Sequence, residues 1–113
     1  MIRNLDLTAL RSFVTVAETG GVTRAAQQLN LTQSAVSMQV KRLEEMLGLP
    51  LLDRAGRGVQ LTAHGEQLLG YGRRILALND EAIGRMTAEA YEGELRLGVP
   101  TDIIFPHIPR VLR

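Results

Sequence analysis

The stretch that decides the fold is residues 23–48, which read TRAAQQLNLTQSAVSMQVKRLEEMLG. It holds two helical patterns separated by a tight break at Asn30-Leu31. The first helix starts near Thr23 as its N-cap. One side of this helix is apolar and carries Val22, Ala25, Ala26 and Leu29. The paired alanines allow another helix to approach closely.

The second pattern predicts a helix from Thr32, again a good N-cap, through about Leu47, with Gly48 as its stop. Its apolar stripe consists of Ala35, Val36, Val40, Leu43 and Leu47. The opposite side is polar and consists of Gln33, Ser34, Ser37, Met38 and Lys41. Two helices that meet at a short turn, the second with a polar outer face, fit a helix-turn-helix.

The polar side suits the major groove of DNA, which admits one α-helix. Side chains of the N-terminal turn reach the bases first, here Gln33 and Ser34, with Ser37 and Met38 one turn later. Glutamine can bind adenine through two hydrogen bonds, serine can bond several base edges, and methionine can pack on a thymine methyl. The alternative is a merely solvated face, and for Met38 an exposed side chain without a base contact.

Upstream of this stretch, the sequence predicts one more helix of the bundle. Asp6 can cap a helix that runs to about Thr19, and Gly20-Gly21 ends it because glycine tolerates the left-handed closing conformation. The apolar stripe of this helix consists of Leu7, Leu10, Phe13, Val14 and Ala17.

Downstream, two short extended pieces, 50–53 and 59–61, flank a tip with two glycines, which predicts a hairpin. In a winged helix-turn-helix this hairpin is the wing, residues 53–59. Arg54 and Arg57 could then reach the DNA backbone or the minor groove. Alternatively they are ordinary hairpin charges.

Thr62 then caps a helical stretch that reaches about Tyr91 without a proline. Such a helix is about 40 Å long, more than the domain needs for its own core. Two adjacent apolar rows run along it, which favours burial against a second copy of the chain over packing on its own domain. The dimerisation residues predicted from these rows are Leu68, Leu69, Ile75, Leu76, Ala82, Ile83 and Met86, and Asn79 at a seam position would favour one register.

Gly93 is expected to break the long helix, and residues 94–99 alternate as a strand does. One strand and a short apolar segment cannot fold alone. We therefore read the end of the chain as the opening of a second domain whose remainder is missing. The predicted organisation is a DNA-binding domain over 1–62, a linker helix over 63–92 and the start of an effector-binding domain over 93–113.

Composition bounds the class of protein without naming it. The chain has 113 residues, a net charge of +1 and no cysteine, which excludes disulfides and thiolate metal sites and agrees with a reducing cytoplasm. No apolar run is long enough for a transmembrane helix, and the N-terminus lacks the pattern of a signal peptide. Because the net charge is so small, a case for DNA binding depends on where the basic groups lie.

Residues that could carry catalysis or metal binding are not grouped in a recognisable way. His64 and His107 are far apart and have no acidic residues at ligand spacing, so we expect no metal site. Glu44-Glu45 is expected to be a solvated helix face rather than an acid–base pair. No serine has a histidine partner in a recognisable arrangement, so an enzyme is disfavoured.

Several motifs together resemble the LysR-type transcriptional regulators. The resemblance covers almost all of residues 5–76 in order and spacing. The matching motifs are FVTVAE at 13–18, AAQQLNLTQSAVS at 25–37, LEEMLG at 43–48, LLDR at 51–54, GRGVQLT at 56–62 and Gly65. Residues 94–98, ELRLG, are similar to the first strand of that family's effector-binding domain.

The resemblance implies a bacterial, cytoplasmic, nucleoid-associated regulator that binds double-stranded promoter DNA as a homodimer or a dimer of dimers. It implies a winged helix-turn-helix with a recognition helix over 33–47 in the major groove. A small-molecule co-inducer would bind the missing domain, the fragment would hold no cofactor, and RNA polymerase would be a further partner.

Carried over by position, the base readers are Gln33, Ser34, Ser37 and Met38. Thr23, Thr32 and Arg42 would contact phosphate, with Arg54 and Arg57 on the wing. The two threonines could act as helix caps only, and Arg42 could instead pair with an acidic residue. Met38 departs from the polar or basic residues common in the family, and Leu52 replaces the usual phenylalanine.

Two functions remain in view. The first is a sequence-specific dimeric DNA-binding domain, motivated by the helix-turn-helix, wing and linker. The second is an interaction module that dimerises through its linker helix without useful DNA affinity, motivated by the small net charge.

Overall fold

The computed structural model describes residues 2–53 and 58–96, with 89–96 as backbone only. Its elements are α1 (Leu7–Thr19), α2 (Val22–Leu29), α3 (Gln33–Leu47), β1 (Leu52–Asp53), β2 (Gln60–Leu61) and α4 (Ala63–Arg96). The chain divides into two units, residues 1–74 and 75–113. The second half of α4 is the described part of the second unit. The predicted mainly helical fold with a two-stranded wing is confirmed.

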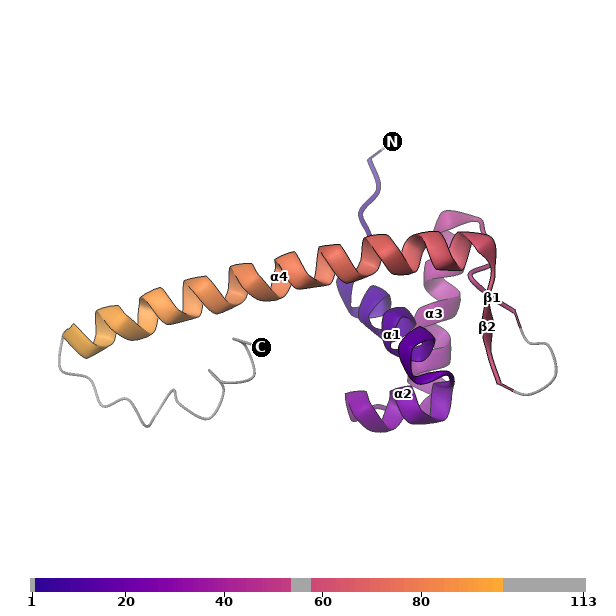
Figure 1. Cartoon of the computed structure of the whole chain (residues 1–113), viewed down its shortest axis with the longest axis horizontal. Helices are drawn as coiled ribbons and strands as arrows, with labels where there is room; N and C mark the ends of the chain where they lie inside the picture. The colour runs from indigo at the N-terminus through magenta and orange to yellow at the C-terminus, as the bar shows by residue number, and fades with distance from the viewer. Residues whose placement is uncertain (1, 54–57, 97–113) are drawn as a thin grey trace. The chain divides into compact units, whose positions relative to one another are not determined.

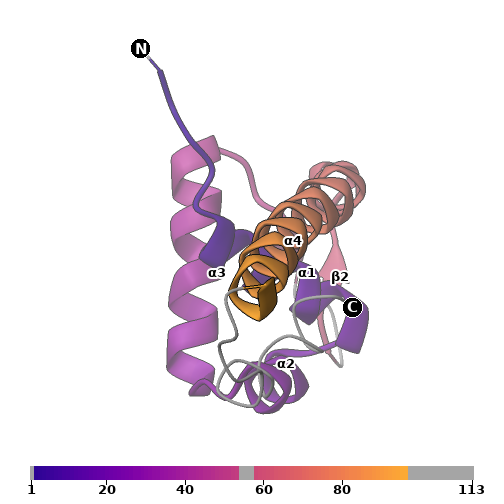
Figure 2. The same ribbon diagram turned by 90° about the vertical axis from the view of Figure 1, so that its left-hand side faces the viewer.

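In the first unit, α1, α2 and α3 gather into one bundle with β1 and β2 paired at its side (Figure 1). The core is aliphatic apart from Phe13. Its largest fully buried apolar side chains come from α1, α3 and the segment before β1, and they are Leu10, Phe13, Val16, Val36 and Leu51. Seen from the end, α3 stands along one side of the bundle and α2 crosses near its lower end (Figure 2).

Local capping sets the ends of α1 and α3 as the sequence predicts. Asp6 Oδ1 accepts hydrogen bonds from Thr8 N at 2.9 Å and Ala9 N at 3.3 Å, which satisfies amides that lack partners in the first turn. Gly20 and Gly48 close α1 and α3 with left-handed φ values of 86° and 71°.

The predicted start of α2 is wrong by two residues. Gly21 is the N-cap, in an extended conformation, and no side chain caps the helix, so Thr23 lies inside the first turn. Glycine is an acceptable N-cap, and once Gly20 has closed α1 a single extended residue is enough to begin α2. The predicted break at Asn30 is confirmed, since this residue adopts a left-handed φ of 57°.

The hairpin lies where the sequence predicts it, with a shorter ladder. β1 and β2 are antiparallel, with Leu52 opposite Leu61 and Asp53 opposite Gln60. The paired residues stop short of Pro50, which has no N–H to donate. The predicted hairpin tip falls largely on residues 54–57, which lie outside the described residues.

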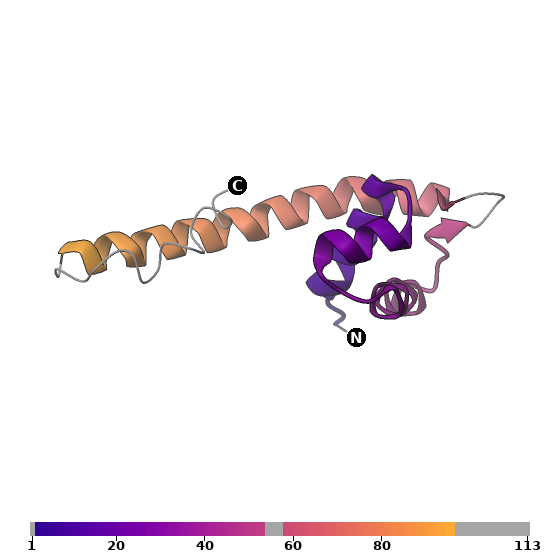
Figure 3. The ribbon, with the colours of Figure 1, turned by 90° about the horizontal axis from the view of Figure 1, so that it is seen from below.

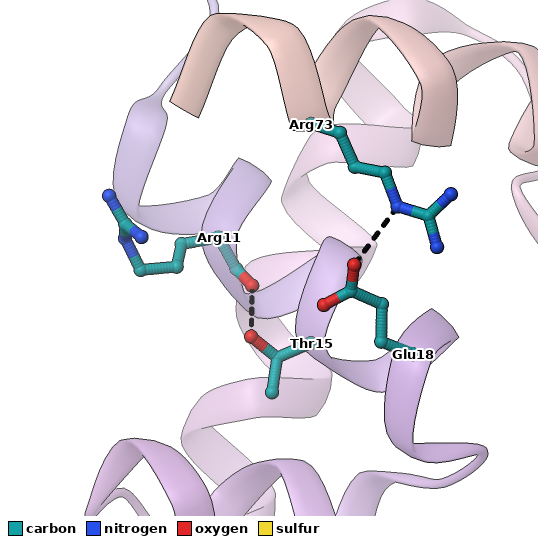
Figure 4. Close-up of polar contacts among 4 residues, drawn as sticks. All are labelled: Arg11, Thr15, Glu18 and Arg73. Atoms are coloured by element: carbon teal, nitrogen blue, oxygen red, sulfur yellow. Dashed lines mark hydrogen bonds and ion pairs between the residues drawn. The ribbon is translucent and has the colours of Figure 1, made fainter. Parts of the chain in front are cut away.

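The first turns of α4 pack tightly on α1. A Cβ added at Gly72 would lie 2.8 Å from Val14 Cγ2 and 3.2 Å from Leu10 Cδ1, so only glycine permits this approach. One turn of α1 further on, Arg73 Nε contacts Glu18 Oε2 at 2.9 Å (Figure 4). Both of these side chains are about half exposed, so the ion pair contributes little beyond orientation. Thr15 is buried and donates to the carbonyl of Arg11 at 2.7 Å.

The prediction that Gly93 ends the long helix is wrong. α4 continues through Gly93 to Arg96, so residues 94–96 of the expected strand are helical, and 97–99 lie outside the described residues. A glycine inside a helix costs about 1 kcal/mol, which does not by itself end it. The predicted start at Thr62 is confirmed, since Gly65 N donates to Thr62 Oγ1 at 3.0 Å.

Candidate nucleic-acid interface

The N-terminal turn of α3 presents its polar side chains outward. Thr32 caps the helix by accepting a hydrogen bond from Ala35 N at 3.0 Å. Gln33 and Ser34 are exposed and Ser37 is half-buried, whereas Val36, Val40 and Leu43 on the other side are buried. The predicted division of α3 into a core side and an outer side is therefore confirmed.

The outer side of this turn forms one wall of a hollow in the surface of the first unit. The opposite walls come from the start of α2 and from the chain just before β2. The lining residues are Thr19, Gly20, Gly21, Val22, Thr23, Arg24, Gln33, Ser34, Ser37, Gly58 and Val59. The view along α3 shows α2 alongside it and the strands to one side (Figure 3). Four of the predicted contact residues, Thr23, Gln33, Ser34 and Ser37, thus share one concave surface.

Hydroxyl and amide groups of this hollow can exchange hydrogen bonds with base edges and phosphate oxygens. The start of α2 adds backbone amides, because Gly21 supplies no side-chain cap. Arg24 brings a cation to the same surface. The sequence interpretation did not select Arg24, although its place in the first turn of α2, beside Thr23, was a usable signal.

Met38 and Arg42 lie outside this hollow, one helical turn apart on the exposed side of α3. Met38 is 51% exposed. Arg42 is exposed, and its Nη2 lies 3.4 Å from Met38 Sδ, a weak contact. Among the described residues Arg42 forms no ion pair with an acidic side chain, so its guanidinium is available to an external anion. The remaining predicted cations, Arg54 and Arg57, lie outside the described residues.

The expectation that Glu44 and Glu45 are both solvated is right for one and wrong for the other. Glu45 is exposed. Glu44 is half-buried, and its Oε2 accepts hydrogen bonds from Leu51 N at 2.8 Å and Leu52 N at 3.2 Å. Its partners are seven and eight residues away in the sequence, so helical periodicity alone could not reveal them.

The predicted dimerisation residues differ in solvent exposure. Leu76 is buried, and Leu68, Leu69 and Ile75 are half-buried. Ala82, Ile83 and Met86 are exposed. Two large apolar side chains that the sequence interpretation missed, Tyr71 and Leu78, are also exposed, and the Arg74 guanidinium lies 4.9 Å from the centre of the Tyr71 ring.

The part of the chain that the structure describes lacks two further classes of site. There, no three acidic, histidine or cysteine side chains come together in a way that could hold a metal ion. None of the helices described is both long enough and apolar enough to cross a membrane.

The family model for "Bacterial regulatory helix-turn-helix protein, lysR family" matches residues 7–66. The regulator DgdR of Burkholderia cepacia is 44% identical over 111 residues, which cover 98% of this chain and 38% of DgdR. BudR of Klebsiella aerogenes is 41% identical over 96% of this chain and 78% of BudR.

Two solved structures are similar over most of the described residues. The CbnR DNA-binding domain in complex with DNA gives a TM-score of 0.69 at 38% identity, covering 76% of this chain and 99% of that one. The BenM DNA-binding domain with catB site 1 DNA gives 0.72 at 35% identity, covering 76% and 97%. This chain belongs to the lysR family of bacterial regulatory helix-turn-helix proteins.

Proposed function

We propose that this chain is the sequence-specific DNA-binding and dimerisation region of a transcriptional regulator. The observation that carries the proposal is the hollow in which Gln33, Ser34 and Ser37 of α3 face Thr23 and Arg24 of α2. A polar N-terminal helix turn, with the amide-rich start of a second helix beside it, suits the major groove and its flanking phosphates. The solved structures of the similar CbnR and BenM domains are complexes with DNA, which supports DNA as the partner of this chain.

In this proposal α3 lies in the major groove. Gln33, Ser34 and Ser37 read base edges, and Met38 packs against a thymine methyl. Thr23, Thr32 and Arg42 bind phosphate oxygens, and Arg54 and Arg57 of the wing contact the backbone or the minor groove. Arg24 joins the phosphate contacts because it lines the same hollow.

The longer regulator is part of the same proposal, since the chain spans 38% of the length of DgdR. Residues 1–62 bind DNA, α4 pairs two copies, and an effector-binding domain follows α4 rather than beginning at Gly93. That domain would bind a small co-inducer, and the regulator would act in the cytoplasm on promoter DNA beside RNA polymerase.

Selection of bound fragments from bacterial genomic DNA, followed by fluorescence anisotropy with one selected fragment, tests the proposal. Gln33→Ala should weaken binding to that fragment by about 1–3 kcal/mol, the value of one good base contact. Gln28→Ala is the matched control, since Gln28 is exposed on α2 and does not line the hollow. Equal affinity of the unmodified chain for selected and scrambled DNA contradicts the proposal.

A second function, an interaction module that pairs through α4 without binding DNA, is favoured by one observation. Leu78 and Met86 on α4 are 65% and 61% exposed. DNA binding through the polar hollow does not account for such large exposed apolar side chains. Light scattering with and without DNA separates the two functions: a dimer that never shifts DNA supports the interaction module.

A further inference from the structure

Glu44 organises the whole chain reversal that follows α3. Its backbone carbonyl accepts hydrogen bonds from Gly48 N at 2.8 Å and Leu49 N at 3.2 Å, which close the helix. Its side-chain Oε2 accepts from Leu51 N at 2.8 Å and Leu52 N at 3.2 Å. Because Leu52 is the first residue of β1, the carboxylate joins α3 directly to the root of the hairpin.

The same short segment is held from its other side by the start of α4. Thr62 Oγ1 donates to Pro50 O at 2.6 Å, and Thr62 N donates to Leu51 O at 3.0 Å. A Cβ added at Gly65 would lie 2.1 Å from Leu51 O, so the backbones are in close contact here. Leu51 itself is 1% exposed. The root of β1 is therefore clamped between α3 and α4.

Glu44 also lies in line with the proposed base-reading face. Ser37, Val40 and Glu44 follow one another along α3, and together with Leu52 they line a second, smaller hollow. The lining of this smaller hollow therefore extends from Ser37 on α3 to Leu52, the first residue of the hairpin. A carboxylate near DNA repels phosphates, so this side chain is not a phosphate contact. The two charge-assisted hydrogen bonds that Glu44 accepts from backbone amides explain why a carboxylate lies here.

We propose that Glu44 is a positioning residue that fixes the β1–β2 hairpin relative to α3, so that hairpin and recognition helix meet DNA as one surface. This inference rests on the proposed function and adds a residue to it that touches no DNA. It assigns to Glu44 the relative placement of two DNA-contacting elements, in addition to its part in closing the helix.

The test compares Glu44→Ala with Glu45→Ala in the full chain, by anisotropy with the selected fragment. Each substitution removes one carboxylate from the same turn of α3. Reduced repulsion of DNA therefore raises the affinity of both variants equally and cancels in the comparison. We expect Glu44→Ala to bind about tenfold more weakly than Glu45→Ala. Glu44→Gln keeps an oxygen acceptor in place but loses the charge that strengthens both hydrogen bonds, so it should bind more weakly than Glu45→Gln and more tightly than Glu44→Ala. It also serves as the folded variant should Glu44→Ala fail to fold.

A readout beyond affinity separates positioning from general stability. With Arg54→Ala and Arg57→Ala already present, Glu44→Ala should cost no further affinity, whereas it should keep its full effect beside Gln33→Ala. Additive losses in both backgrounds overturn the assignment. So does equal affinity of Glu44→Gln and Glu45→Gln, which would show that the charge-assisted hydrogen bonds of Glu44 play no part.

The outcomes also distinguish this inference from the proposed function. If the unmodified chain does not discriminate the selected fragment from scrambled DNA, the proposed function fails and the assignment fails with it. If the unmodified chain discriminates, but Glu44→Ala and Glu45→Ala bind equally well, only the assignment of Glu44 is overturned.

Discussion

The Ser12 hydroxyl on α1 donates a hydrogen bond to Oε1 of Gln39 on α3. Ser12 is 1% exposed and Gln39 is half-buried, so the contact lies on the inner side of α3, behind the base-reading turn. The apolar side chains around it, Val36 and Val40, would tolerate a small rotation of α3 because dispersion contacts are non-directional. A directed hydrogen bond does not tolerate that rotation, so it helps to set which residues of α3 face outward.

We therefore expect Ser12→Ala to lower the free energy of unfolding by about 1–2 kcal/mol, because the Gln39 carbonyl is left without its partner. Urea denaturation measures this loss. Thr8→Ala is a suitable control, since Thr8 is on the exposed side of α1. In a double-mutant cycle with Gln39→Ala, a coupling energy near zero would contradict the role of this bond.

Gly72→Ala should destabilise the first unit by about 1–3 kcal/mol, although alanine favours helices over glycine. The added Cβ would lie 2.8 Å from Val14 Cγ2, and valine is stiff at χ1 in a helix. Gly70→Ala is the matched control: apart from the neighbouring backbone of α4, no atom lies within 4 Å of the added Cβ, so it should stabilise by up to about 1 kcal/mol.

Thermal unfolding of the two glycine variants measures the difference. Val14→Ala should recover part of the loss in Gly72→Ala by removing the methyl group in the way. A Gly72→Ala protein as stable as Gly70→Ala would show that α4 does not pack on α1 as closely as described.

The features that the sequence predicts well are those set by neighbouring residues. Asp6, Thr32 and Gly48 act on amides and carbonyls within four residues, so their type and place were enough to define the ends of α1 and α3. Thr23 and Gly93 show the limit of the same logic. Each residue type allows a helix end without requiring one, and the surrounding chain decides.

The features that the sequence does not reveal depend on residues far apart in the chain. Ser12 and Gln39 are 27 residues apart, and nothing in the period of either helix indicates that they meet. Glu44 has the spacing of a surface residue, but the backbone of β1 returns to it. For the candidate site, the interpretation placed Gln33, Ser34 and Ser37 on the outer side of α3, as the structure has them, but it did not select Arg24, although Arg24 follows Thr23 in the first turn of α2.

Pairing of two chains through α4 is a separate expectation. Met86→Asp should weaken dimerisation more than tenfold, since a two-fold interface would bury the new charge twice. Ala77→Asp adds the same charge on the opposite side of the helix, where it should have little effect. Sedimentation over a range of protein concentrations gives the dimer dissociation constant. If Ala77→Asp disrupts the dimer and Met86→Asp does not, the proposed surface is on the wrong side of α4.

Ser34→Glu should abolish specific binding, because it places a carboxylate in the hollow where phosphates and base acceptors would approach. Ser34 is exposed, so the larger side chain fits without disturbing the core, and thermal stability should change little. Gln28→Glu makes the same change in net charge on the exposed side of α2 and should lose far less affinity. The comparison by anisotropy at two salt concentrations separates local from long-range repulsion, since only the long-range part is screened at higher salt. Unchanged affinity of Ser34→Glu would remove this residue, and the N-terminal turn of α3 with it, from the DNA interface.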